Sequence, residues 1–240
     1  MIWVYGICDR PDLPLPRRRG LAQAPLDSVR ADALLAVISR HVHPPSEPAL
    51  DSLWVHERVV ERLMAERAVL PMRFGSKVDD DEALTAVLEV RQRAFLAALD
   101  RVRGRVELGV RVLRSSAGGN GSAVAAVPAV TPPATGRDYL LGKLQEGKRV
   151  DKTAAAIHDP LAALAVDSRR QPQRSVDELL RASYLVERGG IARFRSAVDR
   201  LQTAHPDAAI LCTGPWPTYS FVEDPTRLAA TPGTPTIGAR

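Results

Sequence analysis

Residues 105–113, Arg-Val-Glu-Leu-Gly-Val-Arg-Val-Leu, are the stretch from which we infer the fold class. Apolar side chains alternate along it with polar or small ones, and a period of two predicts a β-strand with one buried face. Gly104 precedes the stretch and is suited to end a helix, because glycine readily adopts the left-handed backbone conformation found there. We therefore expect a domain boundary near Gly104, with residues 105–113 as the first strand of a second domain.

The chain after this strand alternates between further helical and strand patterns. Helices are expected over residues 136–158 and 191–201, and strands within 161–170, over 183–188 and over 208–212. The first helix should stop before Pro160, because the residue preceding a proline avoids the helical conformation. Strand, helix, strand, strand, helix, strand is the order of a ferredoxin-like domain, an antiparallel sheet with both helices on one face.

The first hundred residues predict a smaller α+β unit. Strands are expected over residues 2–8 and 33–39, helices over 50–67 and 84–102, and an edge strand over 69–74, where Pro71 limits pairing. The acidic run 79–82 precedes the second helix, and its carboxylates are expected to cap the helix N-terminus.

The expected architecture is α+β with two domains. Residues 1–104 form the N-terminal α+β domain, and residues 105–222 form the ferredoxin-like domain. Residues 115–135, mostly Ser, Ala, Gly, Val and Pro without a helical or strand period, are expected to be a mobile insertion. The tail 223–240 has little to bury and is expected to be disordered.

Composition narrows the class of protein. The net charge of +5 arises within residues 105–240, where 18 basic residues face 13 acidic ones; this modest excess favours a solvated surface over nucleic-acid binding. No apolar run approaches the ~18 residues that cross a bilayer, and no secretory signal is expected. The only cysteines, Cys8 and Cys212, lie in apolar strand patterns and are expected to be free thiols, which favours the reducing cytosol.

Motifs for catalysis or cofactors are not found. His56-Glu57 resembles the start of the zinc helix His-Glu-x-x-His, but position 60 is Val, so a satisfied structural histidine or a surface ion pair is expected there. No nucleophile elbow, phosphate loop or dinucleotide turn is present. We expect no catalytic residues, no metal site and no cofactor.

Aromatic residues gather near the end of the chain. The stretch 213–222, Thr-Gly-Pro-Trp-Pro-Thr-Tyr-Ser-Phe-Val, carries Trp216, Tyr219 and Phe221 directly after the last expected strand. Two prolines restrict its backbone and remove N–H donors, so it is expected to be an extended or turning arm beyond that strand. One interpretation is that the arm packs on its own domain, and another is that its rings anchor a partner.

This arm, the run Leu70–Gly75 (Leu-Pro-Met-Arg-Phe-Gly) and the opening Trp3–Ile7 (Trp-Val-Tyr-Gly-Ile) together resemble the GvpF/GvpL family of gas vesicle proteins. The motifs stand in the family's order over nearly the whole chain, although Thr218 stands where the family usually has a second proline. The resemblance implies an accessory or minor structural protein, in the cytoplasm or on the gas vesicle. It also implies contact with the hydrophobic shell protein GvpA, assistance in nucleation and assembly, and contact with other gas vesicle accessory proteins.

Under this reading the edge run and the arm form or border the surface that covers apolar shell protein, by strand addition or by holding a helix in a groove. The expected partner-binding residues are Met72, Arg73, Phe74, Pro215, Trp216, Tyr219 and Phe221. The alternative role for the same motifs is structural, sealing the two domains together. The alternative function is a ferredoxin-like domain that binds a small molecule or nucleic acid, for which Tyr184 alone offers a stacking platform. Neither nucleic acid nor a membrane is the expected partner.

Overall fold

The computed structural model describes residues 1–42, 49–115 and 136–222. The chain divides by its internal contacts into two compact units, Met1–Glu107 joined by the residues from Trp216 on, and Leu108–Pro215. By these contacts the arm residues from Trp216 on group with the first unit, and the expected domain bounds of 1–104 and 105–222 stay a prediction. The expected mobile insertion and disordered tail fall, apart from Ser115, outside the described residues.

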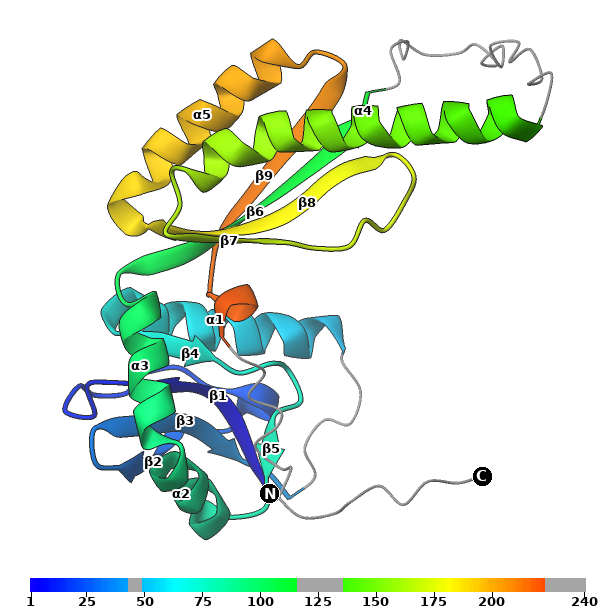
Figure 1. Cartoon of the computed structure of the whole chain (residues 1–240). Coiled ribbons are helices and arrows are strands. Elements are labelled where there is room, and N and C mark those ends of the chain that lie inside the picture. Colours follow the sequence, from blue (N-terminus) through cyan, green and yellow to red (C-terminus); the bar gives the residue numbers. More distant parts are fainter. Residues whose placement is uncertain (43–48, 116–135, 223–240) are drawn as a thin grey trace, which may run out of the picture. The chain divides into compact units, whose positions relative to one another are not determined.

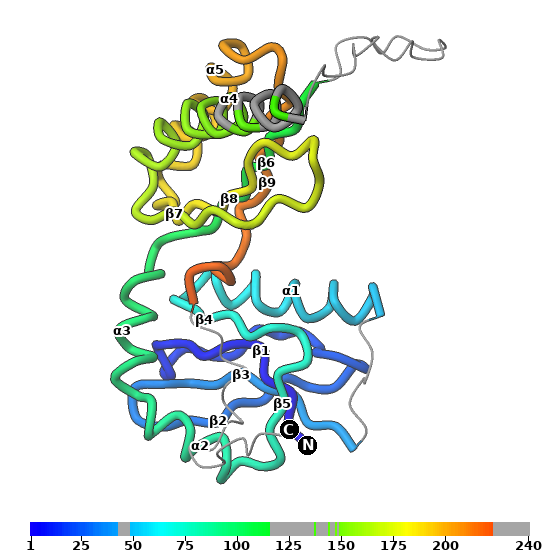
Figure 2. The backbone as a smooth tube through the Cα atoms, turned by 45° about the vertical axis from the view of Figure 1, so that its right-hand side comes forward, coloured from blue at the N-terminus to red at the C-terminus, as the bar shows by residue number. Residues whose placement is uncertain are grey.

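The first unit contains a five-stranded sheet (Figures 1 and 2). Its strand order is β2-β3-β1-β4, and β5 also pairs with β1. Strand β1 pairs antiparallel with β3, β4 and β5, and β2 pairs antiparallel with β3. The strands are β1 (Ile2–Cys8), β2 (Asp27–Ala31), β3 (Leu34–Arg40), β4 (Val69–Pro71) and β5 (Lys77–Val78).

Helices cover both faces of this sheet (Figure 1). Helix α1 (Leu50–Glu66) packs on one face, and α2 (Asp81–Val90) and α3 (Gln92–Val102) pack on the other. The central strand β1 supplies both layers, because alternate side chains of a strand point to opposite faces. Its pairing with β3 shifts register between Val4 and Gly6, a bulge that exchanges the two faces of the strand. Consequently Trp3, Tyr5 and Cys8 face α1, while Ile2, Val4 and Ile7 face α2 and α3.

Two strands of this unit were not predicted, and the second helix differs from its prediction. β2 is an edge strand with the sequence Asp-Ser-Val-Arg-Ala, in which only Val29 and Ala31 are buried, so its alternation is faint. β5 has only two residues. The helix expected over 84–102 is broken at Arg91, whose ψ of 11° lies outside the helical range, so that α2 and α3 lie along different directions (Figure 1).

The second unit contains a four-stranded antiparallel sheet with the order β7-β8-β6-β9. The register is antiparallel for β7 and β8, and bonds from Arg114 to Asp177 and from Ser115 to Asp207 set the end of β6 against the starts of β8 and β9. Helices α4 and α5 cover one face and share one core with the sheet (Figure 1). The elements are β6 (Arg105–Arg114), α4 (Gly136–Ala162), β7 (Asp167–Arg170), β8 (Glu178–Glu187), α5 (Ile191–Ala204) and β9 (Ala208–Trp216).

Three predictions for this unit need correction. Helix α4 continues past Pro160 to Ala162, since the fully buried Leu161 holds the last turn in the core. Strand β9 continues through Pro215, which an edge strand tolerates because its outer N–H groups need no strand partner. Tyr184 is fully buried against Phe194 of α5, and its hydroxyl bonds His158, so it offers no stacking platform for a base.

Candidate functional site

Three of the predicted partner-binding residues meet at one groove in the first unit. Arg73 and Phe74 follow β4, and Tyr219 begins the 3₁₀ turn η3 (Tyr219–Phe221) of the arm. Together with the first turns of α1 they enclose a groove of about 480 Å³. We call it the α1 groove. Its lining consists of Leu50, Leu53, Trp54, His56, Glu57, Arg73, Phe74 and Tyr219.

His56 is the buried residue at the base of the groove. The side chain is 2% exposed, and its Nδ1 accepts a hydrogen bond from Trp3 Nε1 at 3.0 Å. Its Nε2 lies 2.8 Å from the carbonyl oxygen of Met72, so a neutral imidazole with its proton on Nε2 satisfies both partners. Burial lowers the pKa of His56 to about 4, although the bond to Met72 acts in the opposite direction. The expectation of a satisfied structural histidine is confirmed.

Phe74 lines the groove from the segment after β4. Its ring stands edge-on to Trp3, with ring centroids 4.7 Å apart, and edge-on to His56 at 5.8 Å. This edge-to-face packing fixes the phenyl ring, which remains partly exposed on its other side. The groove therefore has a rigid aromatic wall whose position is set by the buried residues behind it.

The opposite wall was missed by sequence reasoning. Leu50, Leu53 and Trp54 of α1 are 68%, 38% and 50% exposed. The buried stripe is His56, Val59, Val60 and Leu63 instead. A signal was present, because residues 50, 53, 54 and 57 share one helical face by their i, i+3, i+4, i+7 spacing. Helix α1 thus has two stripes, and only one of them faces the sheet.

Tyr219 and Glu57 form the polar end of the groove. Tyr219 Oη donates to Glu57 Oε2 at 2.9 Å, across 162 positions of sequence. Burial raises the pKa of Glu57, the bond from Tyr219 lowers it in part, and the nearby Glu61 carboxylate raises it further. Burial, and then the Glu57 carboxylate, raise the pKa of Tyr219. The hydroxyl therefore remains a donor over the physiological pH range.

The arm is held in place by more than this bond. Ser220 donates from its backbone N and its hydroxyl to the two oxygens of Glu107, at 2.8 and 2.6 Å. Glu107 is only 8% exposed, and Thr218 and Phe221 are buried. Hydrogen bonds to a buried carboxylate are among the stronger kinds in proteins. Residues 218–221 of the arm are thus an integral part of the first unit.

The other predicted partner-binding residues lie elsewhere. Met72 has no exposed surface and packs in the core toward α2 and α3, because its backbone continues the line of β4, so its side chain is not available to a partner. Phe221 lies in a separate hollow of about 270 Å³ beside Leu70 and Phe95. Pro215 and Trp216 are exposed but line neither hollow.

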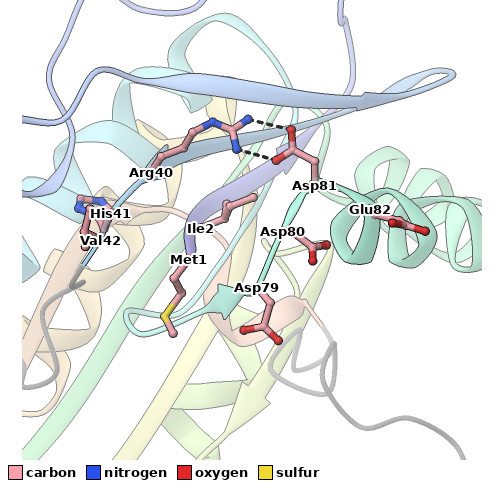
Figure 3. Close-up of a pocket in the computed structure, with 9 residues that line it drawn as sticks. All are labelled: Met1, Ile2, Arg40, His41, Val42, Asp79, Asp80, Asp81 and Glu82. Atoms are coloured by element: carbon pink, nitrogen blue, oxygen red, sulfur yellow. Dashed lines mark hydrogen bonds and ion pairs between the residues drawn. The ribbon is translucent and has the colours of Figure 1, made fainter.

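A larger hollow, of about 850 Å³, lies at the start of β1 (Figure 3). Met1, His41 and the acidic run 79–82 border it. Two of its four carboxylates have structural roles, because Asp80 Oδ1 caps α2 by accepting from Ala83 N at 2.9 Å, as predicted, and Asp81 pairs with Arg40. In the part of the chain described by the structure, no three His, Cys, Asp or Glu side chains are grouped to bind a metal ion.

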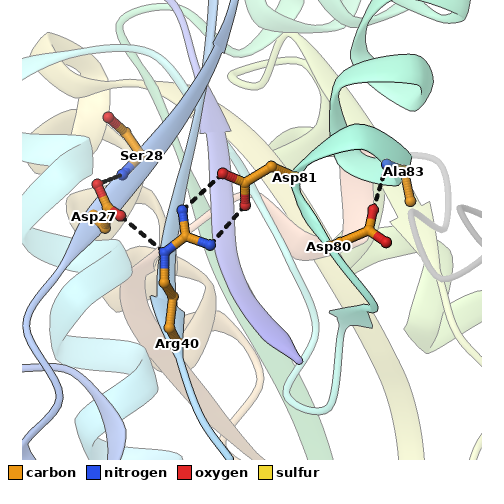
Figure 4. Close-up of polar contacts among 6 residues, drawn as sticks. All are labelled: Asp27, Ser28, Arg40, Asp80, Asp81 and Ala83. Carbon is orange, nitrogen blue, oxygen red and sulfur yellow. Dashed lines mark hydrogen bonds and ion pairs between the residues drawn. The ribbon is translucent and has the colours of Figure 1, made fainter.

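Arg40 joins three elements at this hollow (Figure 4). Its Nη1 and Nη2 bond the two oxygens of Asp81 at 2.6 and 2.9 Å, and its Nε bonds Asp27 at 3.1 Å. This arrangement fastens β2 and β3 to the start of α2, and it lowers the pKa of Asp81 through the hydrogen bonds from Arg40. The hollow is therefore bordered by a structural ion-pair network, whereas the α1 groove offers apolar surface.

The groove unites the three stretches whose resemblance was noted in the sequence: Trp3 behind it, Phe74 on one wall and Tyr219 at one end. The model of the family described as gas vesicle synthesis protein GvpL/GvpF matches residues 1–223. The chain belongs to the GvpL/GvpF family. The match spans all three stretches.

Relatives in this family are similar over most of their length. Gas vesicle protein F of Streptomyces sp. (strain CB03234) is 31% identical over 236 residues, which cover 92% of this chain and 99% of that protein. Gas vesicle protein F2 of Halobacterium salinarum is 31% identical over 228 residues, with 92% of each chain covered. Gas vesicle protein L of the same Streptomyces strain is 30% identical over 187 residues, covering 71% of this chain and 68% of that protein.

Solved structures of GvpF share the fold. The crystal structure of GvpF from Anabaena sp. PCC7120 matches with a TM-score of 0.75 at 20% identity, covering 92% of this chain and 95% of that one. GvpF from Microcystis aeruginosa matches with a TM-score of 0.73 at 18% identity, covering 92% and 98%. Membership of the GvpL/GvpF family assigns the chain a role connected with gas vesicles. None of the described helices combines the length and apolar character required to span a membrane.

Proposed function

We propose that this protein is an accessory or minor structural protein of the gas vesicle that binds the hydrophobic shell protein GvpA. In this role it assists nucleation and assembly of the vesicle and keeps shell subunits from aggregating before they assemble. It works without a catalytic centre, in the cytoplasm and at the vesicle. Family membership supports the gas vesicle role, and the α1 groove carries the proposal of shell binding.

The groove has the properties that transient cover of an apolar protein requires. Three large side chains of α1 are exposed side by side, and the facing ring of Phe74 is held rigidly by Trp3. Exposed apolar side chains gathered at a rigid groove are typical of protein-binding sites. Because the walls are already in place, binding would require little ordering of this protein.

Strand addition at β9 receives less support than docking in the groove. The outer edge of β9 is occupied by side chains of α5: Gln202 Nε2 donates to the Ala208 carbonyl, and Ile210 N donates to Gln202 Oε1, both at 2.7 Å. Arg195 Nη2 donates to the carbonyl of Gly214 at 2.8 Å. A carboxamide that bonds both groups imitates a neighbouring strand, and such covering is how proteins protect a sheet edge. The second unit, for which we propose the ferredoxin-like assignment, is accordingly not the expected docking site.

The test is retention of purified shell protein by immobilised variants of the full chain. We expect Trp54→Ala and Phe74→Ala to weaken retention at least tenfold, as truncation of central aromatic anchors does. Val90→Ala is the matched control, because Val90 is 86% exposed on α2 and lies outside the groove. Trp216→Ala compares a second exposed tryptophan, on the arm but outside the groove, and reports whether the arm adds to binding.

Folding must be checked in the same experiment. Each variant is compared with the unmodified chain by circular dichroism and thermal unfolding, and Met72→Ala shows the signature of a core defect because Met72 is fully buried. Wild-type retention by folded Trp54→Ala and Phe74→Ala variants would refute shell binding through the groove. Light scattering of shell protein with and without this protein then tests whether aggregation is suppressed.

A further inference from the structure

A carboxylate stands at the polar end of an otherwise apolar groove. Glu57 lies on the same face of α1 as Leu53 and Trp54, one helical turn further along. Its Oε2 accepts from Tyr219, and no described residue donates to its Oε1. Within the described residues, Glu57 Oε1 is thus left free to accept, next to the apolar side chains proposed to anchor another protein.

Arg73 is the cationic side chain that lines the same groove, but it is not among the groups that shift the pKa of Glu57. The charged group that acts on it is Glu61, a second carboxylate at i+4, and like charges at this spacing destabilise a helix slightly. His56 beneath is held neutral between Trp3 and Met72. Arg62 is engaged with Glu66 at 2.7 Å, further along the helix. No lysine or arginine among the described residues forms an ion pair with Glu57.

The shape of the exposed stripe indicates the form of the partner. Residues 50, 53, 54 and 57 span two turns of α1, roughly 10 Å at 1.5 Å per residue. A helix packs on another helix by fitting its side chains between rows with this spacing. An amphipathic helix therefore suits the groove.

We propose that the α1 groove receives an amphipathic helix of the partner in which a lysine or arginine lies one turn from a large apolar side chain. The apolar side chain packs between Trp54 and Phe74, and the cation bonds Glu57 Oε1. The inference rests on the proposed function, since it specifies the chemistry that the same groove selects. A charged hydrogen bond at the edge of an apolar contact adds specificity, because a bound helix lacking the cation would cover Glu57 Oε1 without giving it a donor.

Two synthetic helical peptides test this without the shell protein. Both carry one leucine stripe; one has lysine a turn from the central leucine, and the other has glutamine at that position. Fluorescence anisotropy measures their affinity for the full chain. We expect the lysine peptide to bind about tenfold more tightly, in line with a hydrogen bond to a charged group. The preference should decline as salt is raised from 50 mM to 500 mM.

Variants of the protein test whether Glu57 causes the preference for the lysine peptide. Glu57→Gln retains an acceptor for Tyr219 and should abolish the preference, while Glu89→Gln, a matched change on the exposed part of α2, should leave it intact. Trp54→Ala should weaken both peptides equally. The inference is overturned if the intact protein binds neither peptide, binds both equally, or keeps its preference in Glu57→Gln.

The outcome is separable from that of the proposed function. If Trp54→Ala loses the shell protein but Glu57→Gln shows no loss of the lysine preference, shell binding stands and the cation contact is wrong. If the peptides behave as expected but the shell protein is not retained by the unmodified chain, the groove selects such helices and its partner is a different protein.

Discussion

Replacing His56 by glutamine isolates one pH-dependent contribution to the stability of the first unit, the loss of stability in mild acid that the buried imidazole causes. The imidazole is buried and neutral, because protonation would remove the Nδ1 lone pair that accepts from Trp3. Glutamine can accept from Trp3 through its carbonyl and donate to Met72 through its amide, but it does not titrate. The variant therefore keeps both hydrogen bonds in outline while removing the proton equilibrium.

The magnitude follows from the pKa values. His56 has a pKa of about 4 in the fold against an ordinary 6.5, so the unfolded chain binds the proton first and stability falls as pH falls from 6.5 towards 4. At pH 5 the loss relative to pH 7 is about 2 kcal/mol, from roughly 1.5 pH units at 1.36 kcal/mol each. The variant should lack this loss, although it should be about 1–2 kcal/mol less stable at pH 7.

Urea unfolding at pH 7 and pH 5 measures this, followed by tryptophan fluorescence. Trp3 and Trp54 lie in elements of the first unit, and a Trp216→Phe background removes the third tryptophan, which ends β9, so that the signal reports the first unit. Carboxylates that titrate in the same range contribute equally to both proteins and cancel in the difference. If the intact protein and His56→Gln lose the same stability between pH 7 and pH 5, the neutral buried imidazole is refuted.

Three further predictions concern the polar contacts. Gln202→Leu removes the side chain that covers the edge of β9 and should lower the free energy of unfolding by about 1–2 kcal/mol. Sedimentation velocity should show that the variant associates as its concentration rises, and a monomer at all concentrations contradicts this. Glu178→Gln leaves the Arg181 guanidinium without its carboxylate partner and should lower the free energy of unfolding of the second unit by about 3–5 kcal/mol. A loss below about 1 kcal/mol in thermal unfolding would count against this. Burial alone would raise the pKa of Glu178, but the bonds from Arg181, the backbone of Arg174 and Arg111 lower it to about 2, so its stabilisation should disappear as pH falls from 4.5 towards 2. Asp81→Asn should lower the free energy of unfolding by less than about 1 kcal/mol, because Arg40 and Asp81 are both half-exposed. This loss should disappear in 1 M salt, and a larger loss that does not depend on salt would contradict a surface ion pair.

The elements with strong periodicity were predicted well from sequence. β1, β3, α1 and β6 lie within two residues of their expected bounds, because each buries a face whose period is visible in the residues. The errors fall where tertiary contacts override local preference. Pro160 is a helix terminator by local rules, yet the burial of Leu161 carries α4 past it.

The candidate site could be predicted only in part. The motifs brought Arg73, Phe74 and Tyr219 into the prediction, but nothing in the sequence shows that Tyr219 meets Glu57. The role of Trp54 was hidden for a different reason. Helix α1 packs on the sheet through the stripe that contains His56 and Val60, which leaves the stripe that contains Trp54 exposed. The surface on which a helix packs decides which of its two apolar stripes is buried.

The return of the arm to the first unit makes that unit discontinuous in sequence. Residues 108–215 are an insertion within it, and Trp216–Phe221 arrive at its edge only after the inserted unit has been synthesised. During translation the carboxylates of Glu57 and Glu107 consequently lack their donors Tyr219 and Ser220 until these two residues have left the ribosome. Nascent chains therefore expose an α1 groove open at one end, and the last described turn of the polypeptide closes it.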